Sequence, residues 1–218
     1  SLALAALLAL AALFAPVLLQ CLACALAFAA ASPLHTLAWF LCLVLLAALV
    51  AKLLKWQPLI SGSGIPQVEA ELDGHIEQTW YRVILAKLSA GALCILGGLS
   101  LGREGPSIQL GAMCAKGYAR LTKKTPYEER YLLFAGAAAG LSAAFGAPLS
   151  GVMFVLEEVH KHFSVSALLS AMSASIAADF LSAMWFGTTP VLPFSLTETL
   201  PLSLYWTLIL LGAITGIC

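Results

Sequence analysis

Charge is scarce in this chain of 218 residues. Charged side chains make up 10% of it, 61% of its residues are hydrophobic, and its mean hydropathy is +0.96. Soluble domains usually carry charge at about 25% of their positions, so this composition argues against a soluble enzyme. The 11 basic and 11 acidic residues cancel, and a chain without net positive charge has no electrostatic attraction for nucleic acid. We therefore expect an integral membrane protein that binds no nucleic acid.

Clusters of metal-ligating or redox-active residues are also rare. Most of the 6 cysteines lie in apolar stretches, where small buried thiols are the usual interpretation, and this holds for the Cys21 and Cys24 pair too. His160 and His162 are close in sequence, but no further cluster of ligands accompanies them. We expect no metal site and no cofactor.

Long apolar runs broken by glycine and proline predict helices, because a membrane-spanning helix needs about 20 apolar residues and a barrel would show alternating strands. Long helices are expected at 1–31, 34–55, 80–100 and 164–186, and another begins near 203. Shorter ones are expected from the break at 61–66 to 74, from 102–106 to 121, at 127–141 and at 147–159. Small residues at 135–144 suit close packing of helices in lipid. The predicted fold class is all-α, with polytopic membrane helices and broken, re-entrant helices.

The distribution of lysine and arginine predicts the orientation of these helices. Lys52 and Lys55 end the second span, and further basic residues from Lys116 to Lys124 are expected in a loop. If the helices at 61–74 and 105–121 enter the membrane and return, one orientation collects nearly all basic residues on the cytosolic side. This orientation predicts a cytosolic N-terminus and an external loop at 187–202.

Two helix starts combine glycine and proline with a polar side chain. They read Gly-Ser-Gly-Ile-Pro at 62–66 and Gly-Arg-Glu-Gly-Pro at 102–106. Helix N-termini expose unpaired N–H groups that attract anions, glycine lets the backbone approach a ligand, and proline costs no hydrogen bond in the first turn. A carboxylate at membrane depth is usually kept for ion or proton movement. Glu104 therefore suggests a carboxylate that occupies an anion site or leaves it. The alternative for each motif alone is an ordinary turn at the membrane surface.

Five motifs together resemble the CLC family of chloride channels and proton-coupled chloride transporters. They are the two helix starts, Gly-Ala-Ala-Ala-Gly at 136–140, Ala-Pro-Leu-Ser-Gly at 147–151 and Leu-Glu-Glu at 156–158, in the family's order and spacing. The resemblance implies that residues 1–202 are the first of two inverted repeats and that 203–218 begin the second, truncated repeat. It also implies a multi-pass protein of the plasma or inner membrane, in contact with lipid. A homodimer of complete subunits is expected, and the missing second repeat is needed for a complete pathway.

The resemblance further assigns an anion site to the two helix starts. The hydroxyl of Ser63 would bind chloride, with the backbone N–H groups of Gly64 and Ile65 nearby. The N–H groups of Gly105 and Ser107 would help to hold the anion. The Gly-Ser-Gly-Ile-Pro pattern favours chloride over fluoride, because fluoride-exporting relatives depart from it.

The resemblance assigns the proton path to three further residues. Glu104 would be the external gate, whose carboxylate blocks the anion path and swings away when it is protonated. Glu158 would transfer protons from the cytosol, and Lys87 would lie near that path, paired with Glu158 or Glu69. Arg103 is expected to make structural contacts with a carboxylate or a carbonyl.

The predicted function is therefore exchange of chloride for protons, by a transporter and not an enzyme. One alternative is a passive voltage- or pH-gated chloride channel, and Glu158 favours the antiporter over it because channels of the family generally lack that acid. Another is a non-conducting half-subunit that needs a complementary chain. An intramembrane hydrolase using Ser63 and His75 lacks a matched third residue. Asp179 stands alone in the helix at 164–186 and has no predicted role.

Overall fold

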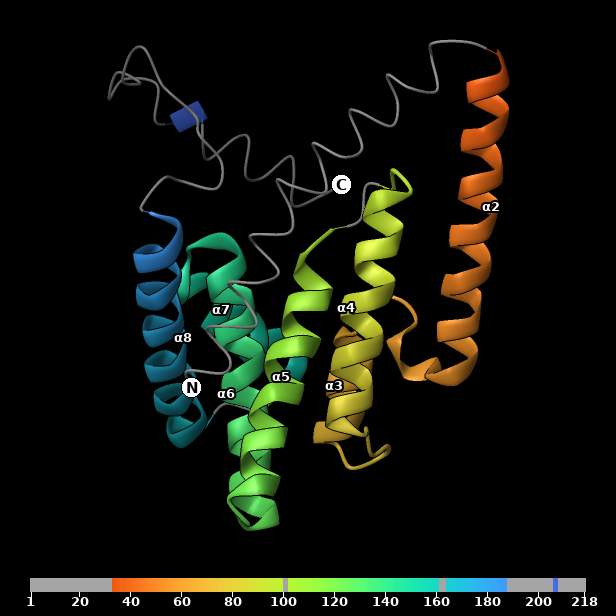
Figure 1. Ribbon diagram of the computed structural model, residues 1–218. Helices are drawn as coiled ribbons and strands as arrows, with labels where there is room; N and C mark the ends of the chain where they lie inside the picture. Colours follow the sequence, from red (N-terminus) through yellow and green to blue (C-terminus); the bar gives the residue numbers. More distant parts are fainter. Residues whose placement is uncertain (1–32, 100–101, 161–163, 188–205, 208–218) are drawn as a thin grey trace. The chain divides into compact units, whose positions relative to one another are not determined.

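The computed structural model describes residues 33–99, 102–160, 164–187 and 206–207 (Figure 1). The helix expected at 1–31, and most of the linker and final helix expected beyond 187, lie outside these residues. The chain divides into two compact units, Ser1–Thr188 and Thr189–Cys218, and the first contains all the described residues except 206–207. The predicted repeat boundary at residue 202 stays a prediction.

The secondary structure of the described residues is helical. Its helices are α2 (Pro33–Trp56), α3 (Ile65–Leu72), α4 (Trp80–Leu96), α5 (Glu104–Leu121), α6 (Pro126–Phe145), α7 (Pro148–Phe154) and α8 (Val165–Phe186). A 3-10 turn, η1 (Pro58–Ile60), follows α2, and a π-helical turn, η2 (Val155–His160), continues α7. The breaks predicted at 61–66 and 102–106 are confirmed, and so is the all-helical fold class. Helix α6 runs past its predicted end at residue 141.

Two of these helices are long and apolar enough to cross a membrane. Leu34–Trp56 has a mean hydropathy of 2.6 with no residue of its apolar window buried, and Val165–Trp185 has a mean hydropathy of 1.5 with 22% buried. Large apolar side chains of α2 are correspondingly exposed, and Leu34, for example, is 74% exposed. An uncovered apolar surface of this kind suits contact with lipid.

Helices α5 and α6 pack through small residues, which let their backbones come close. A Cβ atom added to Gly111 of α5 would lie 3.1 Å from the carbonyl carbon of Gly136 on α6. A Cβ atom added to Gly140 would lie 3.0 Å from the carbonyl carbon of Ser107. The close packing predicted from the small residues at 135–144 is therefore confirmed, and α5 is held at a fixed position against α6.

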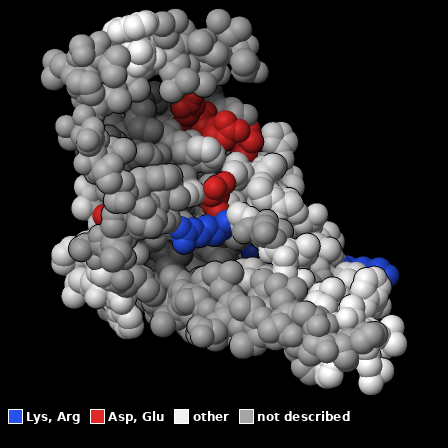
Figure 2. Space-filling view, turned by 90° about the horizontal axis from the view of Figure 1, so that it is seen from above, with Lys and Arg blue, Asp and Glu red and all other residues white. Residues whose placement is uncertain are grey.

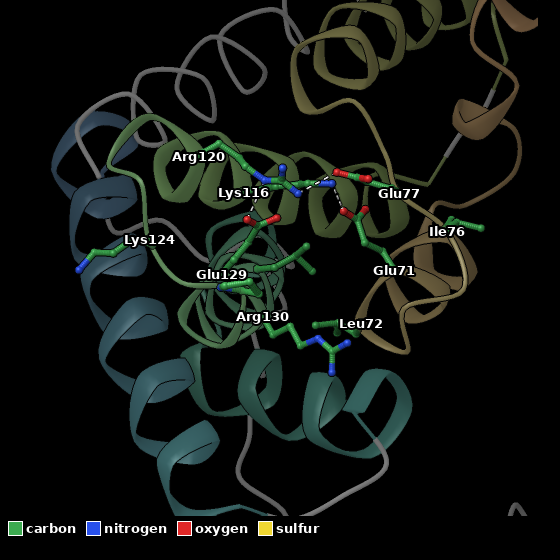
Figure 3. Close-up of a pocket in the computed structure, with 11 residues that line it drawn as sticks. Glu71, Leu72, Ile76, Glu77, Lys116, Arg120, Lys124, Glu129 and Arg130 are labelled. Atoms are coloured by element: carbon green, nitrogen blue, oxygen red, sulfur yellow. Dashed lines mark hydrogen bonds and ion pairs between the residues drawn. The ribbon is translucent and has the colours of Figure 1, made fainter.

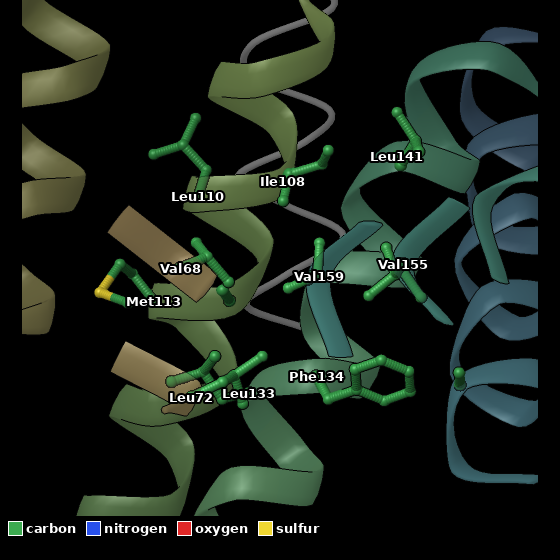
Figure 4. Packing of buried hydrophobic residues seen from close by; sticks show 14 of the residues in the cluster. Val68, Leu72, Ile108, Leu110, Met113, Leu133, Phe134, Leu141, Val155 and Val159 are labelled. Carbon is green, nitrogen blue, oxygen red and sulfur yellow. The ribbon is translucent and has the colours of Figure 1, made fainter. Parts of the chain in front are cut away.

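The apolar core surrounds this contact (Figure 4). It joins α3, α5, α6 and η2 through buried side chains that include Val68, Leu72, Ile108, Met113, Leu133, Phe134, Val155 and Val159. In lipid these side chains hold the helices together through van der Waals packing, because the surrounding lipid tails are as apolar as the core. The short helix α3 is thus fixed along one side against the core, which leaves its N-terminal end free to form a site.

Local signals explain the ends of α6. Thr125 and Glu128 form a capping box, in which each side chain accepts a hydrogen bond from the other residue's N–H group. At the other end Gly146 has a φ of 63°, a left-handed conformation that glycine adopts without strain. Pro148 then opens α7, so the chain turns sharply between the two helices.

Candidate anion site at two helix starts

The starts of α3 and α5 meet at Gly105 and Ser63. A Cβ atom added to Gly105 would lie 2.7 Å from the Cβ atom of Ser63, closer than side-chain atoms approach one another in proteins. Only glycine at position 105 permits this approach. The two motifs, separated by a full helix in the sequence, are therefore side by side in space, as their chemistry predicts.

The turn before α3 presents the Ser63 hydroxyl and the first N–H group of the helix. Gly62 and Gly64 have φ angles of 70° and 101°, which let the chain reverse before Ile65 begins the helix. The Ile65 N–H group donates to Ser63 Oγ at 3.4 Å, a long hydrogen bond. Because Ser63 Oγ is the acceptor in this contact, its hydroxyl hydrogen can be donated to an anion. Ser63 is exposed in the structure.

The carbonyl groups that precede Ser63 are bound by side chains from three helices. Lys87 of α4 donates to the Ile60 and Gly62 carbonyls, at 2.9 Å each. Gln109 of α5 donates to the Leu59 carbonyl at 2.9 Å, and Gln67 of α3 donates to the Ser61 carbonyl at 2.8 Å. These bonds fix the turn and occupy the oxygens that would repel an anion.

Lys87 therefore has a different partner from the one predicted. The sequence suggests pairing with Glu158 or Glu69, whereas the ammonium group donates to two backbone carbonyls of the Ser63 turn. Lys87 is 7% exposed, and burial of an ammonium group is costly unless its donors are satisfied. A backbone turn with several free carbonyls satisfies them without a carboxylate, a solution that the sequence does not reveal.

Glu104 is the first residue of α5 and is exposed. Seen from above in Figure 2, the described residues show acidic side chains toward the top of this face and one acidic group beside a basic one near its middle. At the same helix start, the N–H group of Ser107 donates to the Arg103 carbonyl at 3.1 Å and its hydroxyl donates to the same oxygen at 2.6 Å. Both donors of Ser107 are used inside α5 in this structure, and its part in anion binding stays a prediction. Gly105 is the other predicted donor of this helix.

Within the described part of the chain, Arg103 contacts an aromatic ring, and it has no hydrogen bond there to the carboxylate or carbonyl predicted for it. Its guanidinium carbon lies 5.9 Å from the centre of the Phe145 ring, within the range of a cation–π contact. Phe145 is the last residue of α6, so this contact connects the start of α5 to the end of α6. Arg103 therefore helps to hold the start of α5 in place, and its guanidinium group contacts the Phe145 ring.

Glu158 lies on η2, away from the two helix starts in sequence but on an element that packs against α3. Both Glu157 and Glu158 are exposed on this turn. A π-helical turn is uncommon, costs regular hydrogen bonding and is often found at functional sites. The sequence motif Leu-Glu-Glu does not indicate a π-helical turn. The structure shows that Glu158 lies on one.

A second group of charged residues lines a cavity of about 290 Å³ at the other end of α5 (Figure 3). Lys116 binds Glu71, and Arg120 binds Glu77 at 2.8 Å and Glu129 at 2.7 Å. Lys116 is 2% exposed, so its predicted place in a basic loop is wrong. It belongs to α5, and its charge faces inward because a carboxylate and a carbonyl receive it.

An all-helical membrane fold in which two broken helices meet at their N-termini defines the class of this protein. The sequence profile described as "Voltage gated chloride channel" matches residues 42–218. The chain belongs to this family, the voltage-gated chloride channel or CLC family, as the five motifs predict.

Individual relatives agree with this assignment. An H(+)/Cl(-) exchange transporter ClcA from Citrobacter koseri is 34% identical over 165 residues, and one from Salmonella arizonae is 33% identical over 165 residues. Each alignment covers 74% of this chain and 35% of the relative.

Solved structures show the same fold. The crystal structure of a slow cyanobacterial Cl-/H+ antiporter matches with a TM-score of 0.82 and 32% identity, over 97% of this chain and 51% of that one. A CLC-type fluoride/proton antiporter matches with a TM-score of 0.69 and 27% identity, over 99% of this chain and 54% of that one. The chain thus spans about a third of the curated relatives and about half of these two structures.

Proposed function

We propose that this chain is part of a proton-coupled chloride antiporter, in which chloride binds between the starts of α3 and α5. The contact of Gly105 with Ser63 carries the proposal, because it brings a hydroxyl and two helix N-termini to one place. The proposed donors are the Ser63 hydroxyl and the N–H groups of Gly64, Gly105 and Ile65, and Ile65 exchanges its long 3.4 Å bond to Ser63 Oγ for the anion. Ser107 contributes when its N–H group leaves the Arg103 carbonyl. These donors bear partial positive charge only, which suits an ion that must bind and then leave.

In this proposal Glu104 couples the anion to the proton. Its ionised carboxylate competes with chloride for the same donors, since both are anions. Protonation removes that charge, so the side chain leaves and chloride enters in its place. Occupancy of the site by chloride and protonation of Glu104 therefore favour each other, and by thermodynamic linkage the effect is reciprocal.

Glu158 is proposed to deliver protons from the cytosolic side, and Lys87 to support this path by holding the Ser63 turn. The exposed carboxylate on η2 and the packing of η2 against α3 support this assignment. The proposed setting is a multi-pass protein in lipid with a cytosolic N-terminus, a second repeat that completes the pathway, and a homodimer of complete subunits.

The proposal is tested by flux measurements on the complete protein in liposomes. Glu104→Gln removes the titratable gate, so chloride flux is expected to continue while proton transport against a gradient stops. Glu158→Gln is expected to stop proton transport and to keep chloride transport, whereas Glu157→Gln, its exposed neighbour, serves as the control and keeps both. Proton pumping by the Glu104→Gln protein would contradict the gating role.

A reversal-potential measurement separates this proposal from a passive chloride channel. The potential of an exchanger shifts with an imposed pH gradient, and that of a channel does not. The names of the relatives, which are exchange transporters and antiporters, favour exchange. Flux from this chain alone, and again with a second repeat supplied, tests the non-conducting half-subunit.

A further inference from the structure

One loop residue, Gln78, connects α3 and α5 behind the candidate site. It lies between α3 and α4 and is 1% exposed. Its amide nitrogen donates to the Gln67 carbonyl of α3 at 3.0 Å, and its amide oxygen accepts from Gln109 of α5 at 2.9 Å. Its backbone carbonyl accepts from Lys116 of α5 at 2.7 Å. Both ends of the side-chain amide, and the backbone carbonyl, are thus used to join the two helices.

The Lys116 and Glu71 pair adds a charged connection between the same helices. Lys116 is 2% exposed and the Glu71 side chain 7%, so both charges have been removed from water. Such a pair holds its geometry firmly, because removing one partner leaves an uncompensated buried charge. Lys116 lies about two turns beyond Gln109, on the same face of α5.

These contacts form a buried polar ladder made of Gln109, Gln78, Lys116 and Glu71. It begins beside the candidate site, where a Cβ atom added to Gly64 would lie 2.6 Å from the amide oxygen of Gln109. It ends at the cavity, which Lys116 and Glu71 line (Figure 3). The ladder therefore controls how far α3 can slide or tilt against α5.

The separation of α3 and α5 matters because the proposed chloride donors are divided between them. Ser63 and Ile65 belong to the start of α3, and Gly105 to the start of α5. An anion is held well only when both sets of donors reach it together, and loss of one hydrogen bond to a charged group weakens binding by about tenfold or more.

We propose that Gln78 and the Lys116 and Glu71 pair are positioning residues that set the spacing of the two helix starts and hence the chloride affinity of the site. This inference rests on the proposed function of the site. None of these three residues lies in the motifs that carry the family resemblance.

The test is chloride binding to the complete protein in detergent, measured by calorimetry together with the melting temperature. The double variant Lys116→Met/Glu71→Leu removes both charges and leaves neither one unpaired, so it is expected to fold. Its dissociation constant for chloride is expected to rise by about tenfold or more. Gln78→Met introduces no charge and is expected to weaken binding in the same direction. Lys116→Arg keeps the charged connection and is expected to retain most of the affinity.

Arg120→Gln is the matched control, because Arg120 is on the same helix and lines the same cavity but is 51% exposed and contacts Glu77 and Glu129 instead of α3. Its chloride affinity is expected to be unchanged. If the double variant and Gln78→Met both bind chloride with native affinity while Ser63→Ala binds it more weakly, the inference is wrong and the proposed anion site stands. Unchanged binding in Ser63→Ala overturns the proposed anion site, and the inference with it.

Discussion

Charged side chains at the two ends of α5 differ in their burial and in their partners. At the start of the helix Glu104 is exposed, and the structure gives it no hydrogen bond or ion pair among the described residues. Near the other end Lys116 is buried against Glu71, and Arg120 binds two carboxylates. The charge proposed to change its protonation has no fixed partner among the described residues, whereas the charges that connect helices are paired. This difference separates Glu104, which is proposed to take part in transport, from the residues that are proposed to position the helices.

The largest expected effect comes from closing the start of α5. Gly105→Ala places a methyl group 2.7 Å from the Ser63 Cβ atom and must push the two helix starts apart. Chloride affinity is expected to fall by about a hundredfold, which calorimetry on the complete protein would measure. Gly91→Ala in α4 is the control, since nothing lies within 4 Å of the added atom. It is expected to leave chloride binding unchanged and to stabilise the helix by about 0.5–1 kcal/mol.

An intermediate effect is expected where the first turn of α5 packs against α6. Gly140→Ala adds a methyl group 3.0 Å from the carbonyl carbon of Ser107, and backbone atoms cannot move aside as a side chain can. Overpacking of this kind costs about 1–3 kcal/mol of the free energy of unfolding. Denaturation in detergent would measure it. A melting temperature equal to that of the unchanged protein would contradict the close contact of α5 with α6.

The smallest effect is expected just beyond the end of α5, at the cap of α6. Thr125→Ala removes the hydroxyl that accepts from the Glu128 N–H group, and the cost is about 1 kcal/mol. Hydrogen bonds from Thr125 also lower the pKa of Glu128 below its ordinary value of 4.5. The part of the cap made to the Glu128 carboxylate is therefore complete above pH 4.5 and is lost as the pH falls through the lowered pKa, whereas the Thr125 hydroxyl still accepts from the Glu128 N–H group. Melting curves of both proteins at neutral and acidic pH would show the difference narrowing in acid.

The sequence predicts the two helix starts well because their signals are local. Glycine, proline and a polar residue within five positions specify a break, a helix start and a donor or carboxylate, whatever surrounds them. The same reasoning locates the small residues of α6 that pack against α5. It does not locate their partners, because packing between helices depends on contacts distant in sequence.

The polar ladder could not be predicted in this way. Gln78 reads as a polar loop residue, and Lys116 reads as the first member of a basic loop, because nothing near either residue indicates that it is buried. Their burial follows from the loop folding back over α5, where a carboxylate and a carbonyl meet the ammonium group. The partners of Lys87 could not be predicted for the same reason, since a pattern of side chains does not indicate which backbone carbonyls lie near a lysine. The π-helical turn at Glu158 has no sequence signal that distinguishes it from an α-helix.

The prolines in the first turns of α3 and α5 have a kinetic consequence. Pro66 and Pro106 each fix one backbone angle, so both helix ends keep their shape before any ion arrives. At the proposed anion site, a halide would have little backbone left to order, so association would carry only a small conformational penalty. In the proposed transport cycle the ion would then be bound weakly and released quickly, without refolding of the surrounding chain.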